Sequence, residues 1–549
     1  MKKLVSRFMA VLMAMTMILS MSMTAFAAED ATRLTGTGKL TVNNTVAGKN
    51  LDLYQIFTAT KNEAGNVAYT LNPEYEGFFK AKVDGASDLT GEALSEKAYD
   101  YVKTQVGKDG KNGVNFAKVM LTWILSNTSA VDATHKTVTT ATGSTEIANL
   151  AYGYYVVYPL GATDTSAAPG TGQDYTSVAS LVSVTGTDAI VNMKSNYPTV
   201  VKKVNNKNAD DVNIGDTVTY TLTSKVPDMT GYTSYVFNFK DALSAGLTFK
   251  GITSVTVGSG ENVQNVTAGT GDNTYTLTQD GQNITITMNN FRASNKDKVG
   301  QTITVTYTAT LNKDAVTGFD ANKNSATVEY SNNPGSDGKG ESEPSKVDVH
   351  TFDFKIFKYY KTTTGETETK NPLAGAEFEL YKANTEGTAA DEQAKVNIVD
   401  ERNGVYRQAT PEEVTATNPK FESAKIVSDT DGKVLVKGLD AGTYYLRETK
   451  APDGYNKLLS DIKVEIKANY DTTTGKLTNY TVTYTYNGKP VTVTNNDQAT
   501  SPEVPVENKT GAQLPSTGSK GALMVTLAGI VLFGVLTASK AFCKKKAKN

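Results

Sequence analysis

The sequence predicts a mainly β protein made of several β-sandwich domains in tandem. Short runs alternate apolar residues with threonine at a period of two, and Gly, Asn and Asp interrupt them at regular intervals. The clearest runs are residues 217–223, 283–288 and 302–307. A strand that buries one face and exposes the other has this pattern, and several such strands at regular spacing are typical of a sandwich.

The first 27 residues have the features of a secretory signal peptide. Lys2, Lys3 and Arg7 give a basic start, residues 8–21 form an apolar core, and an A-x-A cleavage site ends at Ala27. Segments of this kind are removed during export and take no part in the fold. We therefore expect a secreted protein that begins after Ala27.

Residues 28–195 form the first predicted domain, which contains the clearest helical stretch of the chain, residues 116–125. Phe116, Val119 and the sole tryptophan, Trp123, recur there at helical spacing. Side chains at this spacing share one face of a helix, so we expect all three to pack against the core of the domain. The first domain is therefore predicted to carry a short helix over its strands.

Two breaks and a polar stretch divide the rest of the secreted chain. Residues 196–345 form the second predicted domain. It ends in a turn-rich segment, residues 332–340, in which Gly, Asn and Asp are frequent. Residues 346–498 form the third predicted domain. Residues 499–513 are polar and contain prolines, which predicts a linker.

The end of the chain carries three features in a fixed order. A five-residue motif comes first, made of Leu514, Pro515, Ser516, Thr517 and Gly518. Residues 521–539 follow without a charge, and about 20 helical residues suffice to cross a bilayer. Residues 540–549 are basic, which holds such a tail on the cytoplasmic side. We therefore expect a C-terminal transmembrane helix over residues 521–539.

This order resembles the cell-wall sorting signal of Gram-positive surface proteins, the LPXTG substrate of sortase transpeptidases. The resemblance implies that sortase cleaves between Thr517 and Gly518 and transfers Thr517 to an amine, finally to one of peptidoglycan. The product is residues 28–517, secreted and anchored to the cell wall. A chance LPSTG motif followed by a permanent membrane anchor is the alternative.

Charge and composition disfavour several other functions. The segments to be removed contain nine of the 55 basic residues and none of the 57 acidic ones, which leaves a net charge of −11. A mildly acidic surface without a basic stripe does not favour nucleic acid. His135 and His350 are the only histidines, and the sole cysteine, Cys543, lies in the tail to be removed. We therefore expect no histidine-based active site, metal site, cofactor or disulfide.

The third domain contains the run YLRETKAPDGY at residues 445–455. It resembles the E-box of Gram-positive pilins, YxLxETxAPxGY, and the domain is similar to the immunoglobulin-like Cna B-type repeats. Strand parity places Lys358 on the inward face of the strand that begins at Phe352. By the same parity, the expected closing strand, residues 491–495, turns Asn495 inward.

The resemblance implies an intramolecular isopeptide bond in this domain. Lys358 attacks the amide carbon of Asn495, Glu448 acts as the acid, and ammonia leaves. Burial favours the neutral amine and the neutral acid that this reaction needs. By analogy with disulfides, closing a long loop stabilises a domain by about 4–5 kcal/mol in the entropy model. An ordinary buried Lys–Glu pair is the alternative.

The second domain resembles the fimbrial isopeptide-forming domain. Its opening strand places Lys202 on a face shared with two valines, and its closing strand begins at Asn324. The resemblance implies Lys202 as the nucleophile, Asn324 as the acceptor and Asp241 as the acid. Lys203 remains a rival for the nucleophile, and Asp216 remains a rival for the acid.

The first domain shows no comparable set, but it ends in residues 189–196, which occupy the place of the pilin motif, a pattern such as VxVYPKN. The resemblance implies that Lys194 is the amine that joins one subunit to the next. The Tyr-Pro pair follows Lys194 here instead of preceding it, so Lys202 and Lys203 remain competitors. A solvated surface lysine is the alternative.

The resemblance covers the chain from the signal peptide to the sorting tail and implies the major (backbone) subunit of a sortase-assembled pilus. Sortase links Thr517 of one subunit to Lys194 of the next. The implied partners are sortase, identical subunits, tip and base pilins, and peptidoglycan. The implied role is structural, with no enzymatic activity beyond the autocatalytic internal bonds. A wall-anchored adhesin of the Cna type, which does not polymerise, is the alternative.

Overall fold

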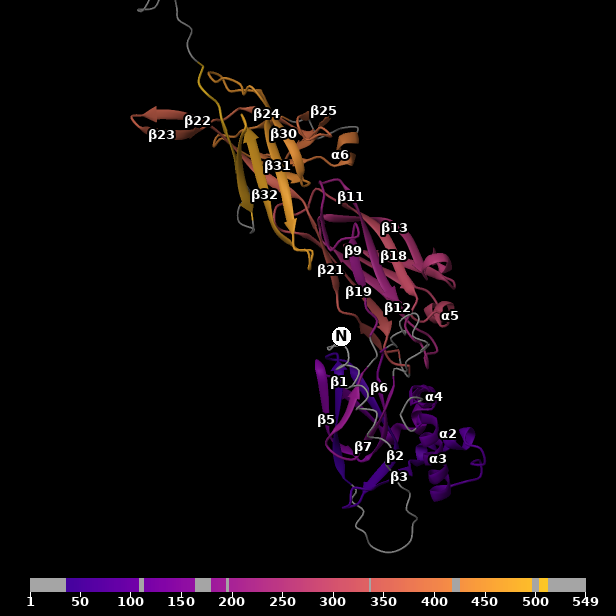
Figure 1. The fold of residues 1–549 in the computed structure, drawn as a ribbon. Helices are drawn as coiled ribbons and strands as arrows, with labels where there is room; N and C mark the ends of the chain where they lie inside the picture. Colours follow the sequence, from indigo (N-terminus) through magenta and orange to yellow (C-terminus); the bar gives the residue numbers. More distant parts are fainter. Residues whose placement is uncertain are drawn as a thin grey trace, which may run out of the picture. The chain divides into compact units, whose positions relative to one another are not determined.

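Strands dominate the structure, a computed structural model, and its longer helices belong to the first domain (Figure 1). The residues it describes are 36–107, 113–162, 179–193, 197–334, 337–416, 425–495 and 503–511 of the 549-residue chain. The chain divides into two compact units. One unit extends to Thr351 and also holds Tyr470–Thr478, and the other begins at Phe352. The prediction of a mainly β fold with several sandwich domains is confirmed.

The first domain is built on two sheets. Its strands are β1 Thr37–Thr45, β2 Asn50–Lys61, β3 Val67–Leu71, β4 His135–Thr139, β5 Gly143–Ala151, β6 Gly153–Pro159, β7 Ser180–Val184 and β8 Ala189–Asn192. One sheet has the order β5-β1-β8, and the other has the order β3-β2-β6-β7 with β4 paired to β2. Apolar side chains of both sheets share one buried cluster, for example Leu40 of β1 and Leu53 of β2.

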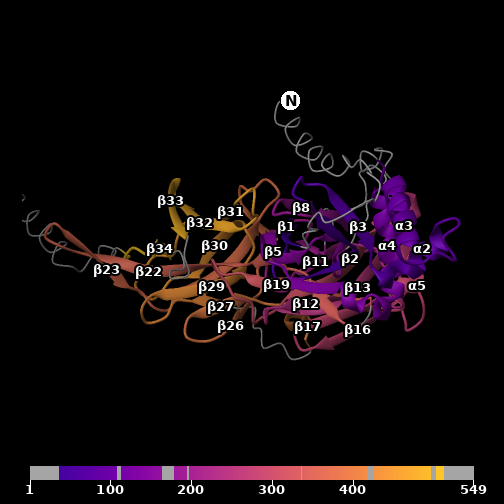
Figure 2. The ribbon, with the colours of Figure 1, turned by 90° about the horizontal axis from the view of Figure 1, so that it is seen from below.

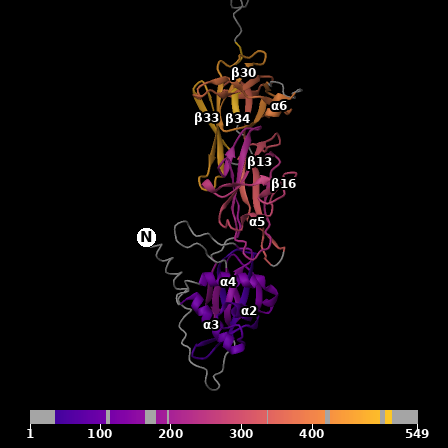
Figure 3. The ribbon, with the colours of Figure 1, turned by 90° about the vertical axis from the view of Figure 1, so that its right-hand side faces the viewer.

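Three helices pack on the other face of the β2-containing sheet, and Figure 3 shows them grouped together. They are α2 Glu76–Lys82, α3 Gly91–Val106 and α4 Gly113–Ser126. The predicted helix is part of α4, but one of the predicted core contacts is wrong. Phe116 is buried and Trp123 packs against the core, whereas Val119 is 44% exposed. The buried positions follow a spacing of four residues, through Met120 and Ile124, and this leaves Val119 on the flank.

The second domain is a sandwich of two sheets. Its strands are β9 Val201–Val204, β10 Ala209–Asp211, β11 Thr217–Lys225, β12 Phe237–Leu243, β13 Leu247–Val257, β14 Gln264–Asn265, β15 Thr267–Ala268, β16 Thr274–Asp280, β17 Asn283–Met288, β18 Thr302–Leu311, β19 Asn322–Ser331, β20 Lys339–Glu341 and β21 Ser345–His350. One sheet has the order β10-β21-β19-β12-β17-β16-β15 with β20 paired to β19, and the other has the order β14-β13-β18-β11-β9. A short helix, α5 Phe291–Asn295, follows β17.

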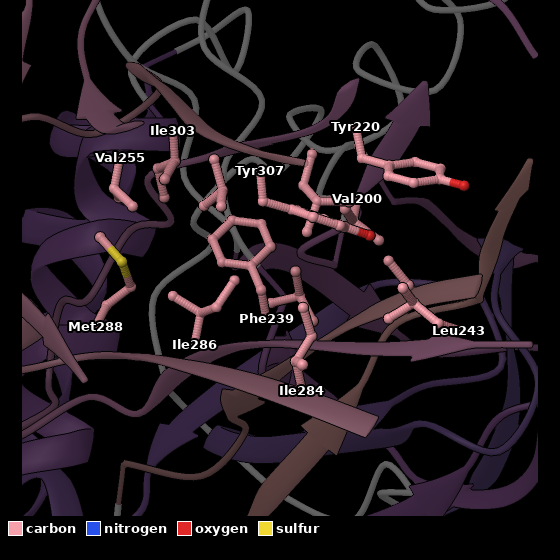
Figure 4. Packing of buried hydrophobic residues seen from close by; sticks show 14 of the residues in the cluster. Val200, Tyr220, Phe239, Leu243, Val255, Ile284, Ile286, Met288, Ile303 and Tyr307 are labelled. Carbon is pink, nitrogen blue, oxygen red and sulfur yellow. The ribbon is translucent and has the colours of Figure 1, made fainter. Parts of the chain in front are cut away.

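The three alternating runs read from the sequence are strands β11, β17 and β18, as predicted. Burial alternates along each of them, because one face turns to the core. Figure 4 shows this core from close by: Phe239 and Ile286 come from one sheet and face Tyr307 from the other. The side chains of these three residues are fully buried.

The boundary predicted at residue 345 is displaced by one strand. β21 pairs with β19 of the second domain in an antiparallel register. Its Val347 and Val349 belong to the core of that domain. The turn-rich segment before β21 gives it the appearance of a new start in the sequence, although it is the last strand of the domain that precedes it.

The third domain is again a pair of sheets. Its strands are β22 Phe352–Thr364, β23 Thr367–Pro372, β24 Glu377–Ala383, β25 Ala390–Lys395, β26 Ile398–Asp400, β27 Val405–Gln408, β28 Ile426–Val427, β29 Lys433–Leu439, β30 Gly442–Lys450, β31 Ile462–Tyr470, β32 Leu477–Tyr486, β33 Lys489–Asn495 and β34 Glu503–Glu507. One sheet has the order β23-β22-β29-β27-β26 with β34 paired to β22. The other has the order β25-β24-β30-β31-β32-β33 with β28 paired to β24. A short helix, α6 Pro411–Thr415, follows β27.

Part of the predicted linker, residues 499–513, is instead a strand of the third domain. β34 lies parallel to β22, and Figure 2 shows the two strands side by side. Val504 and Val506 are buried, so this strand contributes to the core. Pro505 hides the strand in the sequence, yet proline is tolerated at the edge of a sheet.

The expected closing strand is therefore wrong as well. β33 pairs with β32, in the sheet that does not contain β22. Its Val491 is 46% exposed, so the inward face predicted for this strand does not form. The strand that closes the domain against β22 is β34.

Several predicted features lie outside the described residues. They are the signal peptide 1–27, Lys194, the motif Leu514–Gly518, the span 521–539 and the tail 540–549. Within the described ranges, no helix is long and apolar enough to cross a membrane. The C-terminal transmembrane helix stays a prediction.

Replacing both Val504 and Val506 with alanine tests whether β34 is a strand or a linker. Each change removes buried methyl groups, so together they should lower the stability of the third domain by about 3 kcal/mol. The urea dependence of amide exchange in β22 measures this loss. Glu503→Ala, on the same strand but exposed, is the matched control and should change little. Equal effects of the two sets of changes would contradict the strand assignment.

Candidate functional site

The second domain brings three predicted residues together in its core, which we call the middle site. Lys202 comes from β9 of one sheet, and Asp241 and Asn324 come from the adjacent strands β12 and β19 of the other. Period-two alternation turns all three inward, since burial alternates along β9, β12 and β19. Their side chains are buried: Lys202 is 1% exposed, Asp241 3% and Asn324 0%.

A tyrosine that the sequence analysis did not single out completes the middle site. The Lys202 ammonium forms a short ion pair with Asp241 Oδ2 and donates to Tyr307 Oη at 2.7 Å. The Tyr307 hydroxyl donates to Asp241 Oδ2 at 2.8 Å. Tyr307 Oη also accepts from Asn324 Nδ2 at 2.8 Å. Tyr307 lies on β18 among alternating apolar residues, so the sequence predicts its burial but carries no signal for its contacts.

Burial changes the acid–base character of the middle site. Loss of water around the amine lowers the pKa of Lys202 to about 8, although Asp241 acts in the opposite direction. Burial also raises the pKa of Asp241, against the effect of Lys202. Both shifts favour the neutral forms. The amine also lies over two stacked rings, 4.9 Å from the centre of Tyr220 and 5.1 Å from that of Tyr307.

The two rival residues in this domain have other contacts. Lys203 points to the opposite face of β9 and donates to Asn208 Oδ1 at 2.6 Å. Asp216 accepts hydrogen bonds from the backbone and the side chain of Asn213, at 3.0 and 2.9 Å. Asp216 thus stabilises a turn, and Lys203 does not face the core.

The third domain has a second buried lysine, in what we call the C-terminal site. Lys358 of β22 is 0% exposed and Glu448 of β30 is 2% exposed. The Lys358 Nζ lies 3.3 Å from Glu448 Oε1. Burial lowers the pKa of Lys358 to about 8, against the attraction of Glu448. The two predicted residues therefore meet, from strands of the two different sheets.

The asparagine of the C-terminal site is Asn508 and not Asn495. Asn508 follows β34 directly and is 1% exposed. Its Nδ2 donates to Glu448 Oε2 at 2.9 Å and to the Asn456 carbonyl at 2.7 Å. Asn495 instead lies at the end of β33, where it pairs with Tyr480 of β32. Both strands belong to the sheet that does not contain β22.

The signal for Asn508 was present in the sequence. Val504, Val506 and Asn508 alternate in the same way as Val491, Val493 and Asn495, so parity alone fits both strands. The choice between them depends on which strand pairs with β22. That pairing joins segments far apart in the chain and cannot be read from either strand alone. Strand parity therefore could not choose the acceptor.

A glycine, Gly432, allows the chain to pass close to the backbone of Lys358 in the C-terminal site. Gly432 has a φ of +69°, and its carbonyl accepts a hydrogen bond from the Lys358 backbone N–H at 2.6 Å. A Cβ at this position would come within 2.1 Å of the Lys358 carbonyl oxygen. Only glycine fits here, because the φ and the close approach both exclude a side chain.

The first domain has no corresponding site among its described residues, where every lysine is at least partly exposed. Lys39 and Glu146 form an ion pair of 2.9 Å, with side chains that are 36% and 64% exposed. Exposed pairs of this kind contribute little to stability. In the described part of the chain, no group of His, Cys, Asp and Glu side chains is arranged to hold a metal ion.

Comparison with known protein families matches two parts of the chain. Residues 214–334, which hold Asp241, Tyr307 and Asn324, match the model of the Gram-positive pilin backbone subunit 2, Cna-B-like domain. This part of the chain is thus similar to a Gram-positive pilin backbone domain. Residues 358–481, from Lys358 through Glu448, match the SpaA model, a prealbumin-like fold domain.

Similar proteins include a streptococcal surface protein. The trypsin-resistant surface T6 protein of Streptococcus pyogenes serotype M6 is 26% identical over 332 residues, which are 56% of this chain. The chain spans about half of that protein, 52%.

Similar solved structures include two backbone pilins. The T6 backbone pilin of serotype M6 Streptococcus pyogenes is 17% identical, with a TM-score of 0.46, over 88% of this chain and 100% of the other. The major pilin SpaD of Corynebacterium diphtheriae is 19% identical, with a TM-score of 0.41, over 89% of this chain and 100% of the other.

The lowered pKa of Lys202 predicts how the stability of the second domain varies with pH when the Lys202 amine is not cross-linked. In Asn324→Ala the folded state holds fewer protons than the unfolded state between pH 8, near the folded pKa of Lys202, and about 10.4, the unfolded value. Stability should therefore rise with pH across this window. The measurement is the urea midpoint at several pH values.

The double variant Lys202→Met with Asn324→Ala is the matched reference. It keeps the tyrosines of this core, whose ionisation cancels in the comparison, but it lacks the amine. The stability of Asn324→Ala relative to this reference should increase between pH 8 and pH 10. A difference that stays flat or falls would contradict the pKa assigned to Lys202.

Proposed function

We propose that this chain is the backbone subunit of a covalent pilus, with an isopeptide bond inside each of two domains and a sortase-made bond between subunits. The observation that carries the proposal is a lysine, a carboxyl group and an asparagine buried together in both the second and the third domain. The role is structural, because the only chemistry is the formation of the chain's own bonds.

The C-terminal bond joins Lys358 to Asn508, with Glu448 as the acid. The neutral Lys358 amine attacks the Asn508 amide carbon and ammonia leaves. Glu448 lies between the reacting groups, with Oε1 toward the amine and Oε2 toward the amide nitrogen. An amine with a pKa of about 8 is neutral far more often than a surface lysine with a pKa near 10.4.

The middle bond joins Lys202 to Asn324, with Asp241 as the acid. Each bond ties an early strand of its domain to a late one, so it closes a long loop of the unfolded chain. By analogy with disulfides, each closure is worth about 4–5 kcal/mol in the entropy model. Such bonds would stabilise a secreted protein whose only cysteine, Cys543, lies beyond the sorting motif.

Polymerisation joins Thr517 of one subunit to Lys194 of the next, and a peptidoglycan amine ends the fibre. The two lysines that compete with Lys194 for this role already have partners within the second domain. Lys202 is buried against Asp241, and Lys203 is half-buried and donates to Asn208. Sortase, identical subunits, tip and base pilins, and peptidoglycan are the proposed partners.

Intact mass tests the internal bonds. Residues 28–517 should be lighter than the sequence mass by two molecules of ammonia, one for each bond. Asn508→Ala should restore one of them, and Asn324→Ala should restore the other. Asn495→Ala is the matched control and should keep both losses, because Asn508 is the acceptor. An unmodified wild-type mass would refute both bonds, and a loss removed only by Asn495→Ala would move the C-terminal bond back to Asn495.

A ladder of covalent oligomers tests polymerisation. Immunoblots of cell-wall extracts from cells with the matching sortase should show a high-mass ladder for the wild type. Lys194→Ala should abolish the ladder but leave the single anchored subunit and both internal mass losses. Lys203→Ala is the matched control and should keep the ladder. A single wild-type band would instead favour a wall-anchored adhesin that does not polymerise.

A further inference from the structure

The two sites differ in how the carboxyl group reaches the asparagine. In the C-terminal site one carboxyl group spans the distance: Glu448 Oε1 is 3.3 Å from the lysine Nζ, and Oε2 accepts from the asparagine Nδ2 at 2.9 Å. The acid alone therefore connects the nucleophile to the leaving group. No third side chain is needed between them.

The middle site cannot be connected in this way, because aspartate is one methylene shorter than glutamate. Asp241 uses only Oδ2, which receives both the Lys202 amine and the Tyr307 hydroxyl. Its Oδ1 makes no hydrogen bond to any residue that the structure describes. Asn324 donates to Tyr307 instead. The carboxyl group thus reaches the nucleophile but not the leaving group.

The Tyr307 hydroxyl fills this gap. Its oxygen lies 2.7 Å from Lys202 Nζ and 2.8 Å from Asn324 Nδ2. A phenol has one donor and two acceptor positions, and all three are in use here. The ring cannot easily turn away, because it is fully buried and stacked on Tyr220 with a centroid distance of 5.1 Å.

We propose that Tyr307 is a catalytic residue of the middle site, which carries a proton from the Lys202 amine to the departing amide nitrogen of Asn324. This inference rests on the proposed isopeptide bond and assigns its proton path. It also explains why an aspartate can serve in this domain where a glutamate serves in the next. The acid and the tyrosine together span what Glu448 spans alone.

The protons balance through a closed exchange. The neutral Lys202 amine forms a bond to the Asn324 amide carbon, and the carbonyl electron pair moves to Oδ1. The attacking nitrogen, now positively charged, gives one of its protons to Tyr307 Oη, and the tyrosine hydroxyl turns from Asp241 Oδ2 and passes its own proton to Nδ2. The carbon–Nδ2 bond then breaks as the carbonyl re-forms, and ammonia leaves. Tyr307 and Asp241 end with the protons they had at the start.

The hydrogen bond from Asn324 to Tyr307 agrees with this order of steps. An amide nitrogen shares its lone pair with the carbonyl and only donates, as Asn324 Nδ2 does to Tyr307. Once the carbon is tetrahedral, the nitrogen regains a lone pair and can accept the tyrosine proton. Burial and the nearby Asp241 raise the pKa of Tyr307, so it stays a neutral phenol with a proton to give.

The test is the rate of bond formation in Tyr307→Phe, which keeps the ring and removes the hydroxyl. Residues 28–517 are made by cell-free translation and sampled over time, and mass spectrometry of digests follows the Lys202–Asn324 cross-linked peptide. Loss of general acid–base catalysis of this kind slows a reaction by about 100-fold or more. The C-terminal bond in the same molecules is an internal clock and should form at the wild-type rate.

Tyr220→Phe is the matched control, because its ring stacks on Tyr307 but its hydroxyl makes no hydrogen bond to Lys202, Asp241 or Tyr307. It should form the middle bond within a few-fold of the wild-type rate. The folded but unlinked Asn324→Ala variant gives the reference melting temperature, which Tyr307→Phe should match before its bond forms.

Three results would overturn the proposal. They are a wild-type rate in Tyr307→Phe, an equal slowing in Tyr220→Phe, and a Tyr307→Phe domain that melts below the Asn324→Ala reference. The first shows that the proton travels elsewhere, and the other two assign the tyrosine to packing. Failure of the proposed function gives a different result, since the wild type itself would then lack the cross-linked peptide.

Discussion

A lysine amine buried beside a carboxyl group is the constraint on which both cross-linked domains depend. Moving an ion from water into a protein core costs several kcal/mol, and a partner recovers it only with good geometry and full hydrogen bonding. Compensation is incomplete here. Among the described residues, Lys358 Nζ, Glu448 Oε1 and Asn508 Oδ1 have no hydrogen-bond partner, and the same holds for Asp241 Oδ1 and Asn324 Oδ1. An isopeptide bond would remove the ionisable amine altogether. The cost of burial thus becomes part of the driving force for the proposed reaction.

The same constraint sets the order of events. In the middle site the lysine and the asparagine belong to opposite sheets, and in the C-terminal site β22 and β30 do. In the middle site the reacting groups therefore meet only after the two sheets have packed. In the C-terminal site Lys358 and Asn508 come from the paired strands β22 and β34, and it is the acid, Glu448, that arrives with the other sheet. A slip of one residue in β9 or β22 would turn the lysine to solvent, because side chains alternate along a strand. The bond can then form only in the correct register, so it would lock a completed fold without trapping an incorrect one.

Much of this structure can be predicted from local sequence patterns, and the rest depends on which strands pair over long distances in the chain. The strands β11, β17 and β18 and the inward direction of Lys202 and Lys358 follow from period-two alternation, which each strand displays by itself. Asn508 could not be chosen over Asn495 on that basis, since both end an alternating pair of valines and the choice depends on pairing with β22. The predicted domain boundaries were wrong for the same reason. β21 and β34 each follow a polar break in the sequence, yet each pairs with a strand of the domain that precedes it. The contacts of Tyr307 depend on four strands, β9, β12, β18 and β19, which meet in the folded core but not in any single stretch of sequence.

The positions of the proposed bonds along the chain fit with the first domain, for which no bond is proposed. If Thr517 of one subunit is joined to Lys194 of the next, a pulling force enters at residue 194 and leaves at residue 517. The first domain precedes Lys194, so its fold lies outside this path and needs no internal cross-link.

Beyond Lys194 the force passes from Lys202 to Asn324 and from Lys358 to Asn508 through covalent bonds, bypassing most strands of each sandwich. The segment between Asn324 and Lys358 has no cross-link, and there β21 is held by backbone hydrogen bonds to β19 and β10 and by its buried valines, Val347 and Val349. Under tension this segment, and not either cross-linked sandwich, is where the chain would first extend.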